Sequence, residues 1–129
     1  MNQTNEFSFR LKPSDIGGVG VFALHDIETD IPLALKPNEK VGIVRQREDI
    51  PDELIEYCIA NQDGTYSCPP EFNHMHLVWY LNHSNQPNAE LREMSYYSIR
   101  PIKAGEEILI DYNILGEPED KKEDFYKSK

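Results

Sequence analysis

Two short segments towards the C-terminal end of the chain constrain its fold and function most. The first reads Asn-His-Ser-Asn-Gln-Pro-Asn at 82–88, and the second reads Gly-Glu-Glu-Ile-Leu-Ile-Asp-Tyr at 105–112. The first is typical of a turn, because its amide and hydroxyl groups readily bond the nearby backbone. The second is typical of a strand, and it ends on a tyrosine. Together they offer an amide, an imidazole and a phenol, which suit a site that positions and desolvates a substrate.

Length and charge narrow the class of protein. The 129 residues suffice for one domain with a hydrophobic core. The chain has 13 Lys and Arg side chains against 23 Asp and Glu, a net charge of −10. Direct nucleic-acid binding is not expected, because it normally needs a basic surface. The acidic surface favours a cationic partner, although solubility alone also accounts for such a charge.

The cysteines and the N-terminal segment indicate an intracellular protein. Cys58 and Cys68 are the two cysteines, too few for a four-cysteine zinc site. Segment 1–12 lacks the apolar region of a signal peptide, so we expect free thiols rather than a disulfide. No apolar run approaches membrane-spanning length. The sequence therefore predicts a soluble protein of the cytoplasm, or of the nucleus if it acts on chromatin.

Hydrophobic patterning predicts a mainly β domain with short helices. The glycine-rich segment 17–20 is expected to be the turn of a hairpin. The expected strands, recognised by alternating or β-branched apolar residues, are 7–12, 19–23, 31–35, 41–45, 89–91, 94–100 and 107–112. In the first of them, Phe7, Phe9 and Leu11 are expected to face the core.

Two helices are expected between these strands. The clearer one is 48–60, which has Pro51 and two acidic residues in its first turn. Its apolar residues form one stripe that places Cys58 in the core. A second, shorter helix is expected at 71–81, with its bulky apolar residues facing inward.

Metal and carboxylate chemistry are not favoured. His74, His76 and His83 lie near Cys68 in sequence, but none of their separations puts two imidazoles on one helix face. We therefore predict no metal site. The carboxylates at 106–107 point to opposite faces of a strand, so they cannot act together on one bond and are expected to be solvated.

In their order along the chain, these motifs resemble a SET domain. The Gly-Val-Gly at 18–20, the Asn-His-Ser-x-x-Pro-Asn at 82–88 and the Gly-Glu-Glu-x-x-x-Asp-Tyr at 105–112 carry the resemblance, which runs from about Phe7 to Asn113. SET domains are S-adenosylmethionine-dependent protein-lysine methyltransferases. The resemblance implies small curved β-sheets and a C-terminal pseudoknot, in which the last segment passes under the loop after the Asn-His motif.

The resemblance also divides the chain and suggests partners. A SET domain would span 1–113, and a charged tail would span 114–129. Phe125 or Tyr126 in that tail would cover the cofactor or the lysine channel, unless the tail is disordered. The expected partner is a basic protein that carries the substrate lysine. A channel completed across a homodimer is a further expectation, based on the small size of the chain.

The family's site residues carry over by position. Tyr112 would be the catalytic tyrosine. The residues that would bind S-adenosylmethionine are Gly18, Val19 and Gly20 through their backbone, Asn82 at the amino-acid end, His83 through its backbone at the adenine, and Tyr66. The residues that would line the substrate channel are Ile110, Tyr97 and, again, Tyr66.

Three departures from the family pattern affect these expectations. Asn85 stands where many members have cysteine, and no cysteine-rich segment follows Tyr112. The channel must therefore be closed without the zinc-bound flap of many members. Ile110 replaces the common Phe or Tyr and cannot anchor a water molecule, so mono-methylation is not expected to be the limit.

Three functions fit these residues. The leading interpretation is a protein-lysine N-methyltransferase acting on a basic protein, such as a histone-like one. The second is a non-catalytic SET-fold module that binds the cofactor or a peptide; the retention of both Asn82-His83 and Tyr112 argues against it. The third is a methyltransferase for a small-molecule amine, selected by the segment between Val41 and Tyr66.

Overall fold

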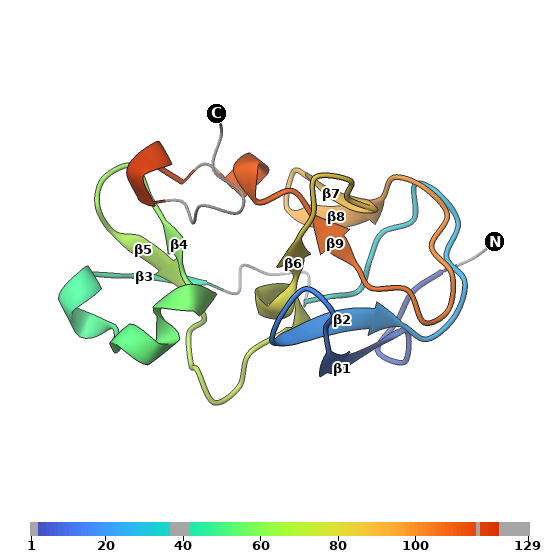
Figure 1. The fold of residues 1–129 in the computed structure, drawn as a ribbon, viewed down its shortest axis with the longest axis horizontal. Helices are drawn as coiled ribbons and strands as arrows, with labels where there is room; N and C mark the ends of the chain where they lie inside the picture. The colour runs from blue at the N-terminus through green and yellow to red at the C-terminus, as the bar shows by residue number, and fades with distance from the viewer. Residues whose placement is uncertain (1–2, 37–41, 116, 122–129) are drawn as a thin grey trace.

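Small β-sheets and short 3-10 helices make up the protein in the computed structural model, which describes residues 3–36, 42–115 and 117–121 (Figure 1). The strands are β1 (Phe9–Pro13), β2 (Val19–Ala23), β3 (Ile43–Arg45), β4 (Ile59–Ala60), β5 (Tyr66–Cys68), β6 (Asn82–His83), β7 (Ala89–Arg92), β8 (Ser95–Ser98) and β9 (Leu109–Ile110). The helices are η1 (Arg47–Asp49), η2 (Asp52–Tyr57), η3 (Leu77–Tyr80), η4 (Tyr112–Leu115) and η5 (Glu119–Lys121). The predicted mainly β class is confirmed.

The first sheet is the predicted hairpin of β1 and β2. The strands pair from Phe9↔Ala23 to Pro13↔Val19, and Gly17 and Gly18 in the turn have φ of 147° and 59°. Phe7, Phe9 and Leu11 were expected to face the core, and this is confirmed only for Phe9. Phe7 is 75% exposed and Leu11 is 38% exposed. Phe7 is exposed because it lies in a turn before β1. In this turn the Asn5 side-chain oxygen accepts a hydrogen bond from the Phe7 N–H at 2.8 Å.

The C-terminal segment lies between β2 and β6. Residue 107 makes an antiparallel bridge to Phe22, and the Ile108 N–H donates to the Val21 carbonyl at 2.8 Å. The next two residues form β9, which pairs in parallel with β6 in the register Asn82↔Leu109 and His83↔Ile110. Figure 1 shows β6 and β9 at the centre of the molecule. A short segment thereby joins the glycine hairpin to the Asn-His motif.

Asn88 holds the C-terminal segment to the loop that follows β6. The side chain is fully buried. Its oxygen accepts the Leu109 N–H at 2.8 Å, and its NH₂ group donates to the Glu107 carbonyl at 2.7 Å. The backbone of the same loop adds bonds from the Ser84 N–H to the Ile110 carbonyl and from the Asn88 N–H to the Leu109 carbonyl. Both ends of loop 84–88 are therefore bonded to β9, as the pseudoknot expectation requires.

Two hydrophobic clusters lie on either side of this central pair. The larger one is built from β1, β2, β7, β8, β9 and the segments that connect them: Phe9, Val21, Ala23, Ile27, Ile31, Leu33, Leu35, Leu81, Ala89, Tyr96, Ile102, Ile108 and Ile110. The smaller one belongs to the β3-β5-β4 sheet: Ile50, Cys58, Ala60, Tyr66 and Cys68. Figure 1 shows this sheet on one side of β6 and β9, with β1, β2, β7 and β8 on the other.

The predicted helix 48–60 is wrong. Its range contains η1, η2 and then β4, and the backbone is already extended at Cys58. Ile59 and Ala60 pair with β5, and strand pairing of these residues is incompatible with a continuous helix. The expected burial of Cys58 is confirmed, and both cysteines are free and buried. Burial and the neighbouring Cys68 thiol raise the pKa of Cys58 to about 12, so this thiol is not a ready nucleophile.

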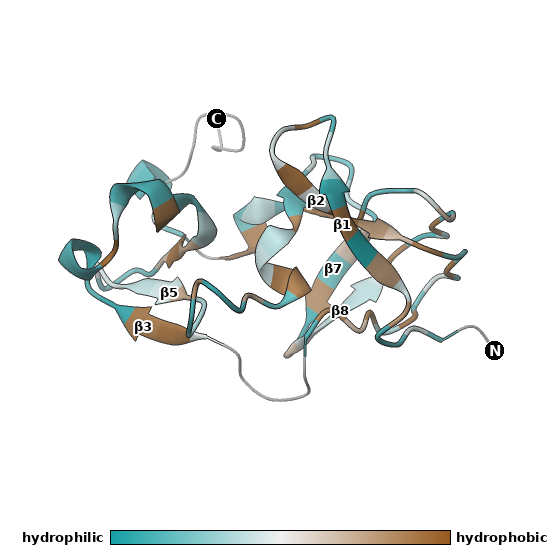
Figure 2. Cartoon of the chain, turned by 90° about the horizontal axis from the view of Figure 1, so that it is seen from below, coloured by the Kyte–Doolittle hydropathy of each residue, from teal (hydrophilic) through white to brown (hydrophobic). Residues whose placement is uncertain are grey.

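The remaining strand and helix predictions are partly confirmed. β7 and β8 form the expected pair around Glu93, which has a positive φ of 57°. Segment 71–81 contains only η3. Segment 31–35 makes one isolated bridge to β8, Pro32↔Tyr97, through the bonds from the Leu33 N–H to the Tyr96 carbonyl and from the Ser98 N–H to the Ile31 carbonyl. Residue 41 of the predicted strand 41–45 lies outside the described residues. The rest of that predicted strand contains β3, which is an edge strand of its sheet. β3 is coloured as hydrophobic in Figure 2, and its Val44 side chain is exposed.

No helix within the described ranges is long and apolar enough to cross a membrane.

Replacing Asn88 by leucine should lower the free energy of unfolding by about 2–5 kcal/mol. The variant leaves the Leu109 N–H and the Glu107 carbonyl without their partner, and each buried unpaired group costs about 1–3 kcal/mol. Urea unfolding followed by circular dichroism measures the change. Gln86→Leu in the same loop is the control, because residue 86 is exposed and its replacement should cost less than about 0.5 kcal/mol. Equal stability of the two variants would contradict this role of Asn88.

Candidate active site

Tyr112 is held at both its backbone and its hydroxyl. It lies one residue beyond β9, after Asp111, and opens η4. Its N–H donates to Nδ1 of His83 at 3.0 Å, and its hydroxyl donates to the Leu81 carbonyl at 2.6 Å. The Tyr112 and His83 rings lie 5.2 Å apart between centroids, tilted by 50°. The phenol is thus fixed against the segment that carries the Asn-His motif.

The phenol of Tyr112 is neutral at physiological pH. Burial raises its pKa to about 12, and the charges of Glu107 and Glu117 contribute further in the same direction. A phenol with this pKa is almost entirely protonated at pH 7, so it offers a hydroxyl group and not a phenolate. The hydrogen of that hydroxyl is directed to the Leu81 carbonyl.

His83 supports Tyr112 through its side chain. A backbone N–H can only donate, so the bond from Tyr112 requires an unprotonated Nδ1. The ring is therefore a neutral imidazole with its hydrogen on Nε2, which lies 3.1 Å from the Asn85 side-chain oxygen. Asn85, which departs from the family pattern, acts here as the acceptor that selects this tautomer. The imidazole is buried and positions the tyrosine.

Asn82, Glu107 and Gly20 meet on the other side of β6. The Asn82 NH₂ group donates to Oε2 of Glu107 at 2.8 Å and to the Val19 carbonyl at 3.2 Å. Oε1 of Glu107 accepts the Ser14 hydroxyl at 2.7 Å. A Cβ built on Gly20 would overlap the Glu107 carboxylate. A larger residue at position 20 would therefore have to displace the end of the Glu107 side chain.

The expectation that residues 106 and 107 are both solvated is wrong. They do point to opposite faces, but Glu107 is half-buried against the hairpin, and Glu106 forms an ion pair with Arg100 at 2.8 Å. Alternation places Glu107 on the face opposite the buried Ile108, where Ser14 and Gly20 of the distant hairpin contact its carboxylate. The sequence carries no local signal for this contact.

The predicted site residues fall into two groups. Those that lie around the β6–β9 pair are Gly18, Val19 and Gly20 in the hairpin, Asn82, His83, Ile110 and Tyr112. Ile110 is 3% exposed and belongs to the larger cluster. Tyr66 instead lies in the smaller cluster, opposite Arg45 and Ala60. Tyr97 is half-buried on β8, beneath the Arg92 guanidinium at 4.9 Å.

Tyr96, and not its neighbour, faces the larger cluster. It is 8% exposed, and burial raises its pKa to about 12. It contributes to the raised pKa of Tyr112, so the two phenols are electrostatically coupled. Alternation along a strand allows only one of two adjacent tyrosines on a given face, but it does not say which one. The packing decides this, since Tyr96 lies in the larger cluster and Tyr97 lies against the Arg92 guanidinium.

The C-terminal segment connects the two clusters beside Tyr112. Oε2 of Glu117 accepts the Ala60 N–H at 2.9 Å, which links the segment to β4. Glu56 of η2 and Glu117 both raise the pKa of Tyr112. Acidic groups from separate parts of the chain therefore surround the phenol. Phe125 and Tyr126, expected to cover the site, lie outside the described residues.

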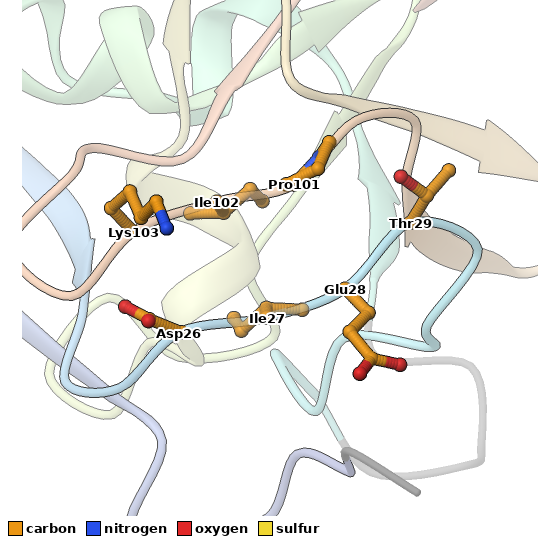
Figure 3. A pocket seen from close by; sticks show the side chains of 7 residues that line it. All are labelled: Asp26, Ile27, Glu28, Thr29, Pro101, Ile102 and Lys103. Atoms are coloured by element: carbon orange, nitrogen blue, oxygen red, sulfur yellow. The ribbon is translucent and has the colours of Figure 1, made fainter.

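A hollow of about 430 Å³ lies away from these residues. It is lined by 26–29 and 101–103, two extended segments joined by the Ile27↔Ile102 bridge (Figure 3). None of the residues predicted for the site lines it. In the part of the chain that the structure describes, no three His, Cys, Asp or Glu side chains are grouped so as to hold a metal ion.

The fold and these contacts identify the family. A comparison with protein families matches residues 18–113 to the SET domain, and the chain therefore belongs to the SET-domain family. This is a family of methyltransferases. Comparison with the curated proteins gives no match.

Two solved structures share the fold. A Plasmodium falciparum protein assigned as a histone methyltransferase is 22% identical with a TM-score of 0.53, covering 82% of this chain and 93% of its own. The methyltransferase domain of human PR domain-containing protein 2 is 22% identical with a TM-score of 0.51, covering 79% of this chain and 74% of its own. At this identity the likeness establishes the fold, and the arrangement of β6, β9 and Tyr112 is argued from this chain itself.

The pKa of Tyr112 predicts a loss of stability in alkali. A folded-state pKa of about 12 lies above the ordinary value of 10.0, so the group stabilises the fold fully below pH 10. This contribution is lost as the pH rises from about 10 to about 12. The difference in urea stability between wild type and Tyr112→Phe, measured at pH 8, 10 and 11, should shrink with rising pH. A difference that stays constant would contradict the raised pKa.

Proposed function

We propose that this protein transfers a methyl group from S-adenosylmethionine to the side-chain amine of a lysine on a basic protein. The observation that carries the proposal is the fixed Tyr112 hydroxyl, bonded to the Leu81 carbonyl beside the Asn-His motif. The Asn82 side chain connects this motif to the glycine hairpin, because it donates to the Val19 carbonyl and to the Glu107 carboxylate. A SET domain that had lost its activity would not need to keep this whole arrangement.

The residues around Asn82 fit the cofactor. Gly18 has a positive φ of 59° and no atom within 4 Å of the position of a Cβ, so its backbone is open to a ligand. The half-buried Asn82 side chain offers an amide oxygen beside that backbone. In this proposal Gly18, Val19, Gly20, Asn82 and the His83 backbone hold S-adenosylmethionine. When bound, S-adenosylmethionine supplies an electrophilic methyl group on a positively charged sulfur.

The lysine must lose its proton before it can attack. Its ordinary pKa is about 10.4, so the neutral form costs roughly 4–5 kcal/mol at pH 7. The acidic groups near Tyr112 attract the protonated lysine to the site, but they oppose its deprotonation. Desolvation in a channel lined by phenols acts in the opposite direction and lowers the lysine pKa. A half-exposed carboxylate is screened by water, so we expect desolvation to dominate.

Tyr112 acts as an aligning group in this proposal. Its raised pKa keeps it protonated, so it is a poor general base at neutral pH. Its oxygen lone pairs can make weak C–H···O contacts with a polarised methyl group, worth about 0.5–1 kcal/mol each. Holding the reacting atoms in line lowers the barrier by removing orientational freedom from the reactants. His83 and Leu81 provide the rigidity that such alignment requires.

The proposed substrate follows from charge. The chain carries a net charge of −10, and Glu56, Glu107 and Glu117 place part of it around Tyr112. A basic protein, such as one with a histone-like tail, matches this field.

Tyr112→Phe should lower the rate of methyl transfer roughly 10²-fold. The change removes the oxygen that aligns the methyl group and keeps the ring against His83. A filter assay with labelled methyl donor and a mixture of basic proteins measures the transfer. Tyr57→Phe is the matched control, because Tyr57 is a half-buried tyrosine of η2 packed edge-on against Tyr80. Loss of activity in both variants to the same extent would contradict a specific role for Tyr112.

The same assay, together with thermal unfolding in the presence of the cofactor, separates the other two functions. A cofactor-dependent rise in melting temperature without label transfer indicates a binding module. Label that appears only in small metabolites indicates a small-molecule amine as the substrate.

Wild-type protein should add more than one methyl group to a good substrate. Ile110 places an aliphatic side chain at the end of β9, which cannot anchor a water molecule next to the amine. Mass spectrometry of the product should show di- or tri-methyl lysine, and Ile110→Tyr should shift the product towards mono-methyl lysine. Because Ile110 is 3% exposed, overpacking costs about 1–3 kcal/mol, and the variant's melting temperature is measured first. Mono-methyl product alone from wild type would contradict this role.

A further inference from the structure

Glu107 is a charged side chain whose position the catalytic tyrosine does not explain. Its carboxylate lies directly on the backbone at Gly20. Ser14 and Asn82 each donate one hydrogen bond to it, at 2.7 and 2.8 Å. A carboxylate accepts about four hydrogen bonds, so these two use about half of its capacity.

Glu107 also lacks a counter-charge among the described residues. No lysine or arginine of the described chain forms an ion pair with it, whereas its neighbour Glu106 is paired with Arg100 at 2.8 Å. A half-buried carboxylate with unused acceptor positions can accept charge-assisted hydrogen bonds from a cationic ligand. The chain keeps it against a glycine backbone and an amide, in the place where the amino-acid end of the cofactor is expected. A cation supplied by a ligand would complete the arrangement.

We infer that the Glu107 carboxylate binds the α-ammonium group of S-adenosylmethionine. This inference rests on the proposed function and assigns one more residue to the same site. The amino-acid end of the cofactor carries an ammonium and a carboxylate. The open backbone at Gly18 suits the carboxylate, and Glu107 supplies the charge-assisted hydrogen bond to the ammonium.

The surroundings of Glu107 favour the ammonium over the sulfonium as its partner. Ser14 and Gly20 both belong to the glycine hairpin, which holds the methionine part in the proposed site. An ammonium presents N–H donors that a carboxylate can accept, whereas a sulfonium presents none. Gly20 takes part because only a hydrogen atom at that position leaves room for the carboxylate. The charge of Glu107 also contributes to the raised pKa of Tyr112, so its field extends into the site.

The alternative is that Glu107 only connects β1–β2 to β6. Calorimetric titration of the full chain with two ligands separates the two roles. S-adenosylhomocysteine carries the amino-acid end, and 5′-methylthioadenosine carries the same adenosine and sulfur without it. Glu107→Gln should weaken S-adenosylhomocysteine binding roughly 10- to 100-fold. Binding of 5′-methylthioadenosine should change less than about twofold, because that ligand has no ammonium group to lose.

Glu56→Gln is the matched control. It removes the same charge from an exposed position whose field also reaches Tyr112, but residue 56 is not part of the hairpin site. It should leave both affinities within about twofold. An equal loss of both ligands in Glu107→Gln would overturn the inference in favour of a connecting role, and unchanged affinity for both would overturn it as well.

A third ligand keeps the test independent of the variant's folding. The desamino analogue of S-adenosylhomocysteine lacks only the ammonium, and wild type should bind it as weakly as Glu107→Gln binds S-adenosylhomocysteine. Glu107→Gln should bind the analogue about as well as wild type does. The ammonium and Glu107 act together, so once one is removed the loss of the other costs little more. Equal affinity of wild type for S-adenosylhomocysteine and its desamino analogue would overturn the inference. Failure of wild type to bind any of them would overturn the proposed function itself.

Discussion

The parallel pairing of β6 with β9 is the contact on which the rest of this structure depends. Each strand is only two residues long, so the pairing by itself contributes little. Asn88 reinforces it by placing a buried amide between the Glu107 carbonyl and the Leu109 N–H, where it substitutes for a further strand. The same segment pairs with β2 at residue 107, two residues before β9 begins. One short stretch of chain therefore determines where the glycine hairpin, the Asn-His motif and the tyrosine lie relative to one another.

The groups that position Tyr112 and the carboxylate of Glu107 lie on opposite sides of β6. On one side of β6, the neutral His83 imidazole and the Leu81 carbonyl fix Tyr112. On the other side, the Glu107 carboxylate organises the hairpin through Ser14 and Asn82. Tyr112 is kept protonated by burial and by the carboxylates around it. A neutral hydroxyl on a rigid support suits the aligning role that we propose for Tyr112.

Local sequence patterns predicted the structure correctly where turn residues and strand alternation are sufficient to form it. The hairpin of β1 and β2 and the pair β7–β8 follow from their turn residues and from alternation. The helix 48–60 failed because β4 pairs with β5, and this pairing overrides a favourable apolar stripe. The orientation of Phe7 failed because the Asn5 side chain forms a turn that alternation does not anticipate.

The sequence by itself determined the β class, the identity of the SET-like motifs and the choice of Tyr112, because residue type and order are enough to recognise them. The tertiary structure alone decided that Glu107 lies on Gly20, that His83 acts through its imidazole, and that Tyr96 faces the larger cluster while Tyr66 lies in the smaller one. These facts depend on contacts between residues far apart in the chain. Such contacts are set by strand register and by which face another strand covers, and no local pattern encodes either.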